Sequence, residues 1–224
     1  MTLTRRSLLL ISAAFAALAA TGAWADTTAP AADATATPAT PADVPDYGIG
    51  DVNAKVRIDE YLSFTCPHCE HFHAEIYPKL KADYIDTGKV RLVLHEVYFD
   101  QYGLYGAMVA RCGGEMRYMG ITDMLYDKQR DWAAPSDVNE VVVQLKKIGR
   151  AAGMNDDQVD ACLKDQTVAE ALVAHYQTST ARDFPNNSFQ GTPSFIVNGV
   201  VNTDMNANMA DADLQKILDA ELAK

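Results

Sequence analysis

The stretch Glu60-Tyr61-Leu62-Ser63-Phe64-Thr65-Cys66-Pro67-His68-Cys69 decides the fold of this 224-residue chain. Its first half continues an alternating apolar segment that begins near residue 56, and this period of two predicts a strand with one buried face. Its second half opens a segment whose apolar residues have helical spacing. A C-x-x-C pair where a strand passes into a helix strongly indicates thiol redox chemistry.

The segments on either side extend this unit. Pro78 is expected to kink or interrupt the helix that begins at Pro67. Residues 89–99 are rich in Val, Leu and aromatic residues and predict a second buried strand. A strand, a helix and a strand in this order form a βαβ unit with two parallel strands.

Residues from about 101 to 182 change to a period of 3.6, which predicts a helical insertion after the βαβ unit. Side chains typical of helix caps mark helix starts at Ser136, at Asn155 with Gln158 and at Thr167 with Glu170. The chain then returns to a strand that follows Thr192-Pro193, a hairpin turn at Asn198-Gly199, and a final amphipathic helix. The fold class is therefore α/β.

The first 25 residues predict a signal peptide. Arg5 and Arg6 precede an apolar run, and Ala23-Trp24-Ala25 is a small-x-small cleavage site. The general secretory and twin-arginine routes both fit, and both lead out of the cytoplasm. Residues 26–46 consist mostly of Ala, Thr, Pro and Asp and predict a disordered tether. Residues 47–224 then fit one domain.

The formal net charge of −11 argues against nucleic acid or an anionic membrane surface as a partner. An alternative is that the charge only keeps an exported protein soluble. No cofactor is predicted from the sequence.

The position of Cys66 predicts that it is the attacking thiolate. The positive end of the helix dipole and the unpaired backbone N–H groups of the first turn favour a thiolate there. His68 adds a donor or a positive charge close to Cys66, and Cys69 is the buried resolving thiol. A lowered pKa of Cys66 stabilises the reduced form, which makes the disulfide a stronger oxidant.

Glu60 falls on the buried side of the strand that leads to the cysteines. A desolvated carboxyl there would have a raised pKa and could shuttle the proton of Cys69, whereas at a solvated strand end it would have no such role. Thr192-Pro193 precedes a β-branched and aromatic run, where a cis bond can present backbone atoms to a bound peptide. Both features extend the predicted catalytic site.

A metal site is the competing interpretation of this stretch, because Cys66, His68, Cys69, His71 and His73 are all able to bind a metal ion. The sequence contains no second C-x-x-C and no H-x-x-x-H, so redox chemistry is favoured and no metal site is expected.

The other histidines are expected to be structural. His71 and His73 are expected on the surface of the helix, and the alternative is that one of them tunes the thiol. His95 and His175 are interpreted as packing or surface residues.

A second pair of cysteines, Cys112 and Cys162, lies on apolar helical faces of the insertion. In an oxidising compartment these residues could form a structural disulfide. The alternative is two free buried cysteines that pack as small hydrophobic side chains.

The stretch 60–69, the helical insertion and Gly191-Thr192-Pro193-Ser194-Phe195 together resemble the bacterial periplasmic disulfide oxidase family DsbA. The resemblance implies a thioredoxin fold, a cis Pro193 that faces the disulfide, and a Thr192 whose backbone binds substrate. It also implies a monomer that donates its disulfide to reduced, unfolded exported proteins. A quinone-linked membrane oxidase of the DsbB type would then reoxidise it.

Thr192 departs from the oxidase pattern, since Thr rather than Val before the proline resembles the isomerase relatives. Those relatives are dimers with an additional N-terminal domain, which residues 26–45 cannot replace. Isomerase or reductase activity therefore remains open, as does a metal-binding or chaperone module without turnover.

Overall fold

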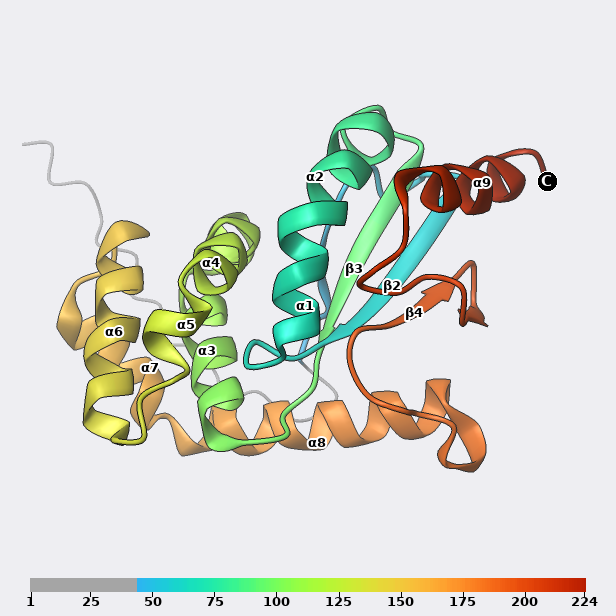
Figure 1. The fold of residues 1–224 in the computed structure, drawn as a ribbon. Helices are drawn as coiled ribbons and strands as arrows, with labels where there is room; N and C mark the ends of the chain where they lie inside the picture. Colours follow the sequence, from blue (N-terminus) through green and yellow to red (C-terminus); the bar gives the residue numbers. More distant parts are fainter. Residues whose placement is uncertain (1–43) are drawn as a thin grey trace, which may run out of the picture. The chain divides into compact units, whose positions relative to one another are not determined.

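The computed structural model describes residues 44–224 (Figure 1). The predicted signal peptide and the expected tether lie outside the described residues, except for the last three residues of the tether. These three are packed against the domain: Val44 is only 8% exposed, and the Asp46 carboxylate is 2.8 Å from His175 Nε2. The packed part therefore includes residues before the expected boundary at 47.

Five strands form one sheet in the order β1-β3-β2-β4-β5. The strands are β1 (Tyr47–Ile49), β2 (Val56–Leu62), β3 (Val90–Glu96), β4 (Ser194–Val197) and β5 (Val200–Asn202). The predicted β2 and β3 pair in parallel, and the other pairs are antiparallel. Asn198 and Gly199, with φ of 48° and 81°, form the predicted turn between β4 and β5.

Strand β1 is not visible in the sequence, because three residues are too few to show a period of two. Gly48 allows this strand to approach β3 closely. A Cβ atom at Gly48 would lie 2.4 Å from the Leu92 carbonyl oxygen, so a larger residue would push the strand away.

The helix after β2 continues through Pro78 rather than ending there. It consists of α1 (Pro67–His71), a π-helical segment η2 (Phe72–Ile76), α2 (Tyr77–Leu80) and a second π-helical segment η3 (Lys81–Ile85). Because Pro78 has no N–H to donate, the wider turns of η2 just before it accommodate the proline. Phe72, Ile76 and Leu80 are buried, as their spacing predicts.

The helical insertion lies between β3 and β4. Its helices are α3 (Gln101–Cys112), α4 (Glu115–Asp127), α5 (Gln129–Trp132), α6 (Val138–Ala151), α7 (Asp156–Lys164) and α8 (Gln166–Asp183). A short helix η4 (Pro185–Asn187) follows, and α9 (Asp211–Leu222) ends the chain.

Of the three predicted helix starts, one is confirmed and two are wrong. Asn155 and Gln158 form the predicted capping box of α7. Asp137 rather than Ser136 caps α6, and Asp165 rather than Thr167 caps α8. In both cases a neighbouring carboxylate accepts the free backbone N–H, which leaves the hydroxyl residue unused.

Cys112 at the end of α3 and Cys162 in α7 form a disulfide with a Cα–Cα distance of 6.0 Å. The bond joins residues 50 apart within the insertion. In the chain-entropy model, closing a loop of this length stabilises the folded state by about 4 kcal/mol.

Helices cover both faces of the sheet. The Tyr84 hydroxyl in η3 donates to Asp219 of α9 at 3.3 Å, and both helices lie on the same side (Figure 1). On the other side, the Tyr61 hydroxyl donates to Asp183 of α8. Since alternate residues of β2 point to opposite faces, Glu60 faces α1, and Asp59 and Tyr61 face α8. None of the helices among residues 44–224 is long and apolar enough to cross a bilayer.

Candidate active site

The C-x-x-C pair lies where β2 passes into α1. Cys66 is the N-cap residue of α1, and the backbone N–H groups of Cys69 and Glu70 donate to its carbonyl oxygen at 3.1 Å. Cys66 is half-buried, and Cys69, one turn later, is fully buried. Both are free thiols. One sulfur is therefore accessible to a partner and the other is enclosed.

The Thr192-Pro193 segment approaches the accessible thiol from a distant part of the chain. Its peptide bond is cis. The Cys66 thiol donates to the Thr192 carbonyl oxygen at a sulfur–oxygen distance of 3.2 Å. The fold thus places the two predicted parts of the site, 126 residues apart in sequence, against each other.

The two thiols have opposite pKa shifts. A hydrogen bond from the Cys69 thiol lowers the pKa of Cys66 to about 5, although burial acts in the other direction. Hydrogen bonds from the backbone N–H groups of Cys69 and His68 lower it further. Burial raises the pKa of Cys69 well above its usual value, and the nearby Cys66 and Glu60 raise it more. At neutral pH the pair therefore holds one thiolate, on Cys66.

Glu60 lies on the buried side of β2, as the alternation predicts, and its side chain is fully buried. Neither of its carboxylate oxygens accepts a hydrogen bond from the described residues. The His73 imidazole lies beside it, with Nε2 at 3.4 Å from Glu60 Oε2. The solvated alternative for Glu60 is therefore wrong.

His73 is buried, so the prediction that it lies on the helix surface is wrong. Its side chain is 2% exposed and stacks on the Tyr126 ring with a centroid distance of 4.3 Å. The π-helical segment η2 begins at Phe72 and rotates the following residues relative to a regular helix, which turns His73 inward. His71, by contrast, is exposed as expected.

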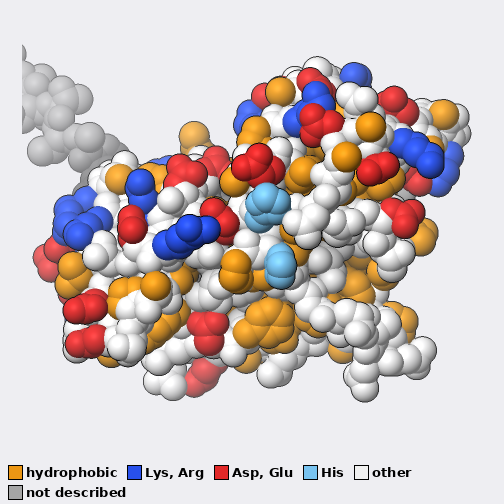
Figure 2. All heavy atoms as spheres, in the orientation of Figure 1, with side chains coloured by type: hydrophobic (Ala, Val, Ile, Leu, Met, Phe, Trp, Pro, Cys, Tyr) orange, Lys and Arg blue, Asp and Glu red, His pale blue; other side chains and the backbone are white. Residues whose placement is uncertain are grey.

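His68 is exposed beside Cys66. Figure 2 shows histidine side chains at the surface over the region of α1, with acidic and hydrophobic side chains next to them. The backbone N–H of His68 lowers the pKa of Cys66, and the role of its imidazole stays a prediction. In residues 44–224, the cysteines and histidines of positions 66–73 do not bring three ligand atoms together.

Gln129 of α5 is a site residue that sequence reasoning missed. Its buried amide donates to the Phe64 carbonyl at 2.9 Å and to the Cys66 carbonyl at 3.0 Å. The helical insertion thereby fixes the loop that carries the cysteines. No motif identifies Gln129, because its role depends only on where the insertion packs.

A protein-family model that covers most of the chain agrees with this geometry. Residues 43–220 match the family model described as thioredoxin. The chain belongs to the thioredoxin family.

The relatives of this thioredoxin-family chain have names that refer to disulfide chemistry. A Rickettsia bellii protein with the provisional name protein-disulfide oxidoreductase is 33% identical over 175 residues, which cover 78% of this chain and 65% of the relative. Disulfide bond formation protein D of Bacillus subtilis is 25% identical, with coverage of 78% and 76%. The chain spans less than two thirds of the length of the Rickettsia relatives.

Solved structures confirm the predicted fold class. Wolbachia pipientis alpha-DsbA1 superimposes with a TM-score of 0.66 at 21% identity, covering 80% of this chain and 92% of that protein. Oxidised BdbD from Bacillus subtilis gives a TM-score of 0.67 at 20% identity, with coverage of 80% and 94%. The chain has a thioredoxin fold with the helical insertion of DsbA structures.

The shifted pKa of Cys66 can be measured in the reduced protein. We expect the ultraviolet absorbance of its thiolate to titrate with a midpoint of about 5. Cys69→Ala removes the hydrogen bond with the largest effect, so the midpoint should move upward toward 9.0. Cys66→Ser is the control and should lose this transition. A midpoint near 9.0 in the unmodified protein would contradict the proposed electrostatics.

Proposed function

We propose that the chain is a thiol–disulfide oxidoreductase that donates the Cys66–Cys69 disulfide to exported proteins as they fold. The observation that carries this proposal is the asymmetry of the pair: Cys66 is accessible with a lowered pKa, and Cys69 is buried with a raised pKa. Stabilising the Cys66 thiolate favours the reduced protein, so the disulfide tends to pass to a substrate.

The reaction consists of two exchanges. A substrate thiolate attacks the Cys66 sulfur, the Cys66–Cys69 bond breaks, and a mixed disulfide forms while Cys69 leaves as a thiolate and takes up a proton. A second substrate thiolate then attacks the substrate sulfur of the mixed disulfide and displaces Cys66, which leaves readily because its pKa is low. Two electrons pass from the substrate to the protein, and the substrate gains a disulfide.

The Thr192-Pro193 segment is proposed to hold the substrate during the first exchange. The Thr192 carbonyl oxygen lies 3.2 Å from the Cys66 sulfur, so a peptide backbone that pairs with this segment would place its own thiolate close to Cys66. The Gln129 amide would keep the cysteine loop in place as the sulfur changes partners.

Glu60 is proposed to exchange the proton of Cys69. A thiolate on the buried Cys69 is unstable and must take up a proton. Glu60 is a buried acid close enough to affect the pKa of Cys69. His73 contacts Glu60 and also lines a surface hollow with Tyr77, Asp123 and Tyr126. A proton could pass between Cys69 and water along this path.

The proposed location and partners follow from the predicted signal peptide and from the relatives. The protein would act in the periplasm as a monomer on reduced, unfolded proteins. A quinone-linked membrane oxidase of the DsbB type would then restore the disulfide.

Cysteine variants test the two proposed roles. With a reduced dithiol peptide as substrate, Cys66→Ser should lose all oxidation, because the attacked sulfur is gone. Cys69→Ser cannot form the disulfide and should also lose oxidation of this peptide. When the variant is instead given a peptide dimer joined by a disulfide, its Cys66 thiolate should attack that bond, release one peptide thiol and accumulate as a mixed disulfide, visible by mass spectrometry, because no Cys69 thiol is present to displace the bound peptide. A double Cys112→Ser, Cys162→Ser variant that remains folded serves as the control and should keep its activity. Substantial oxidation by Cys66→Ser would refute the assignment.

The proposed role of Glu60 predicts a change in the pH dependence. Glu60→Gln preserves the shape of the side chain but cannot carry the proton, so oxidation of the peptide should slow by about 100-fold, and its dependence on pH should weaken. Glu75→Gln, at an exposed position on the same helix, is the matched control. Equal rates and equal pH profiles for the two variants would show that Glu60 has no catalytic part.

A further inference from the structure

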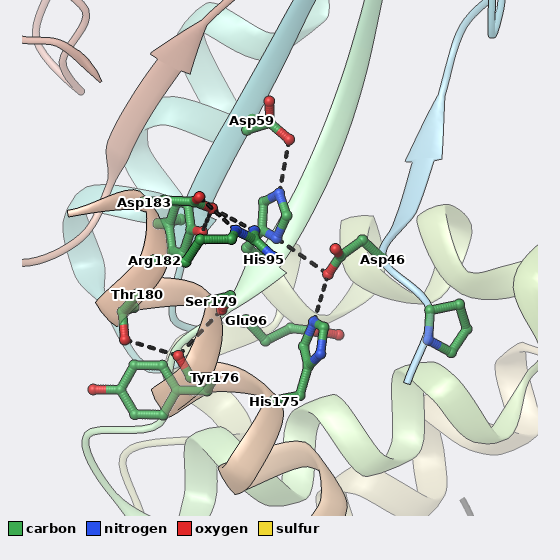
Figure 3. A network of polar contacts seen from close by, with 12 residues as sticks. Asp46, Asp59, His95, Glu96, His175, Tyr176, Ser179, Thr180, Arg182 and Asp183 are labelled. Carbon is green, nitrogen blue, oxygen red and sulfur yellow. Dashed lines mark hydrogen bonds and ion pairs between the residues drawn. The ribbon is translucent and has the colours of Figure 1, made fainter. Parts of the chain in front are cut away.

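Asp46, His95 and His175 meet on the side of the sheet opposite to the active-site helix. Asp46 precedes β1, His95 is in β3 and His175 is in α8 (Figure 3). Within residues 44–224 they are the one group of three such side chains whose ligand atoms all lie within 4.8 Å of one another. We propose that these three residues bind a divalent transition-metal cation, with zinc(II) as the best fit.

The spacing of the three donor atoms suits a tetrahedral zinc ion. Asp46 Oδ1 is 2.8 Å from His175 Nε2 and 3.1 Å from His95 Nδ1. Two zinc bonds of about 2.0–2.1 Å at a tetrahedral angle place their ligand atoms about 3.3 Å apart. Shifts of a few tenths of an ångström would bring both Asp46 pairs to this distance, and the third pair, between the His95 and His175 nitrogens, lies within 4.8 Å.

A buried imidazole nitrogen points into this group. The His95 side chain is 3% exposed, and its Nδ1 pairs with Asp46 Oδ1 at 3.1 Å (Figure 3). A metal ion bound through Nδ1 would take the place of the proton between this nitrogen and Asp46, and the Asp46 carboxylate would become a second ligand.

The other nitrogen of His95 has the partner that metal-binding histidines usually have. Asp59 Oδ1 lies 2.8 Å from His95 Nε2, and Arg57 binds the same carboxylate through its Nε and Nη2 groups. A carboxylate on one nitrogen fixes the proton there and leaves the other nitrogen free for a metal. The Tyr61 ring stacks on His95 at 4.7 Å and fixes the orientation of the imidazole.

The group is open on one side. The side chains of Asp46 and His175 are 24% and 19% exposed, which provides a route for the ion and room for water as a fourth ligand. Oxygen and imidazole donors without thiolates favour zinc over the softer copper(I). Because Asp46 belongs to the segment before β1, a bound ion would tie this segment to β3 and α8.

Zinc binding by the full chain, purified without a histidine tag, tests the proposal. Cys66 and Cys69 must first be oxidised to the disulfide, because free thiolates bind zinc themselves. After treatment with a chelator, calorimetric titration with zinc(II) should give one ion per chain. The melting temperature should rise by about 5–10 °C when free zinc is about 100 times the Kd.

Three variants distinguish this site from adventitious binding. His175→Ala and Asp46→Asn should each weaken zinc binding by about 100-fold or more, and Asp59→Asn by about 10- to 100-fold. His71→Ala, which removes an exposed histidine elsewhere, should leave binding unchanged. If the oxidised chain binds no zinc, or if His175→Ala and His71→Ala bind it equally well, the three residues form only an ion-pair network and the proposal is wrong.

Discussion

The hydrogen bond between the two thiols of the C-x-x-C pair is the interaction on which the account of this protein depends. It exists because α1 begins at Cys66, which places Cys69 one turn further along, inside the core. The same bond stabilises a thiolate on Cys66 and keeps the proton on Cys69. The strand, the cis Thr192-Pro193 bond and Gln129 all hold this pair in position, and each comes from a different part of the chain.

Much of the fold could be predicted from the sequence because its signals are local. The alternation in β2, the C-x-x-C pair and the Asn198-Gly199 turn each depend on residues close together in the chain, and all are confirmed. The same locality explains the buried position of Glu60. Two helix starts were placed wrongly because Asp137 and Asp165 compete with neighbouring hydroxyl residues for one backbone N–H, and a pattern of residue types does not decide that competition.

The features that the sequence does not reveal depend on helix irregularity or on contacts between distant segments. Gln129 supports the cysteine loop only because the insertion packs against it, and no spacing in the sequence reveals this. The sequence pattern predicts His73 on the surface of a regular helix, whereas the π-helical turns before Pro78 rotate it toward Glu60. Asp46 and His175 are 129 residues apart, so their meeting at His95 is visible only in the folded chain.

The reduction potential of the Cys66–Cys69 pair tests the central claim most directly. It is obtained by equilibrating the protein in glutathione buffers and measuring the reduced fraction. Because the lowered pKa of Cys66 stabilises the reduced form, the account predicts a potential more oxidising than about −200 mV. A value of about −270 mV, as in thioredoxin, would contradict the account and indicate a reductase.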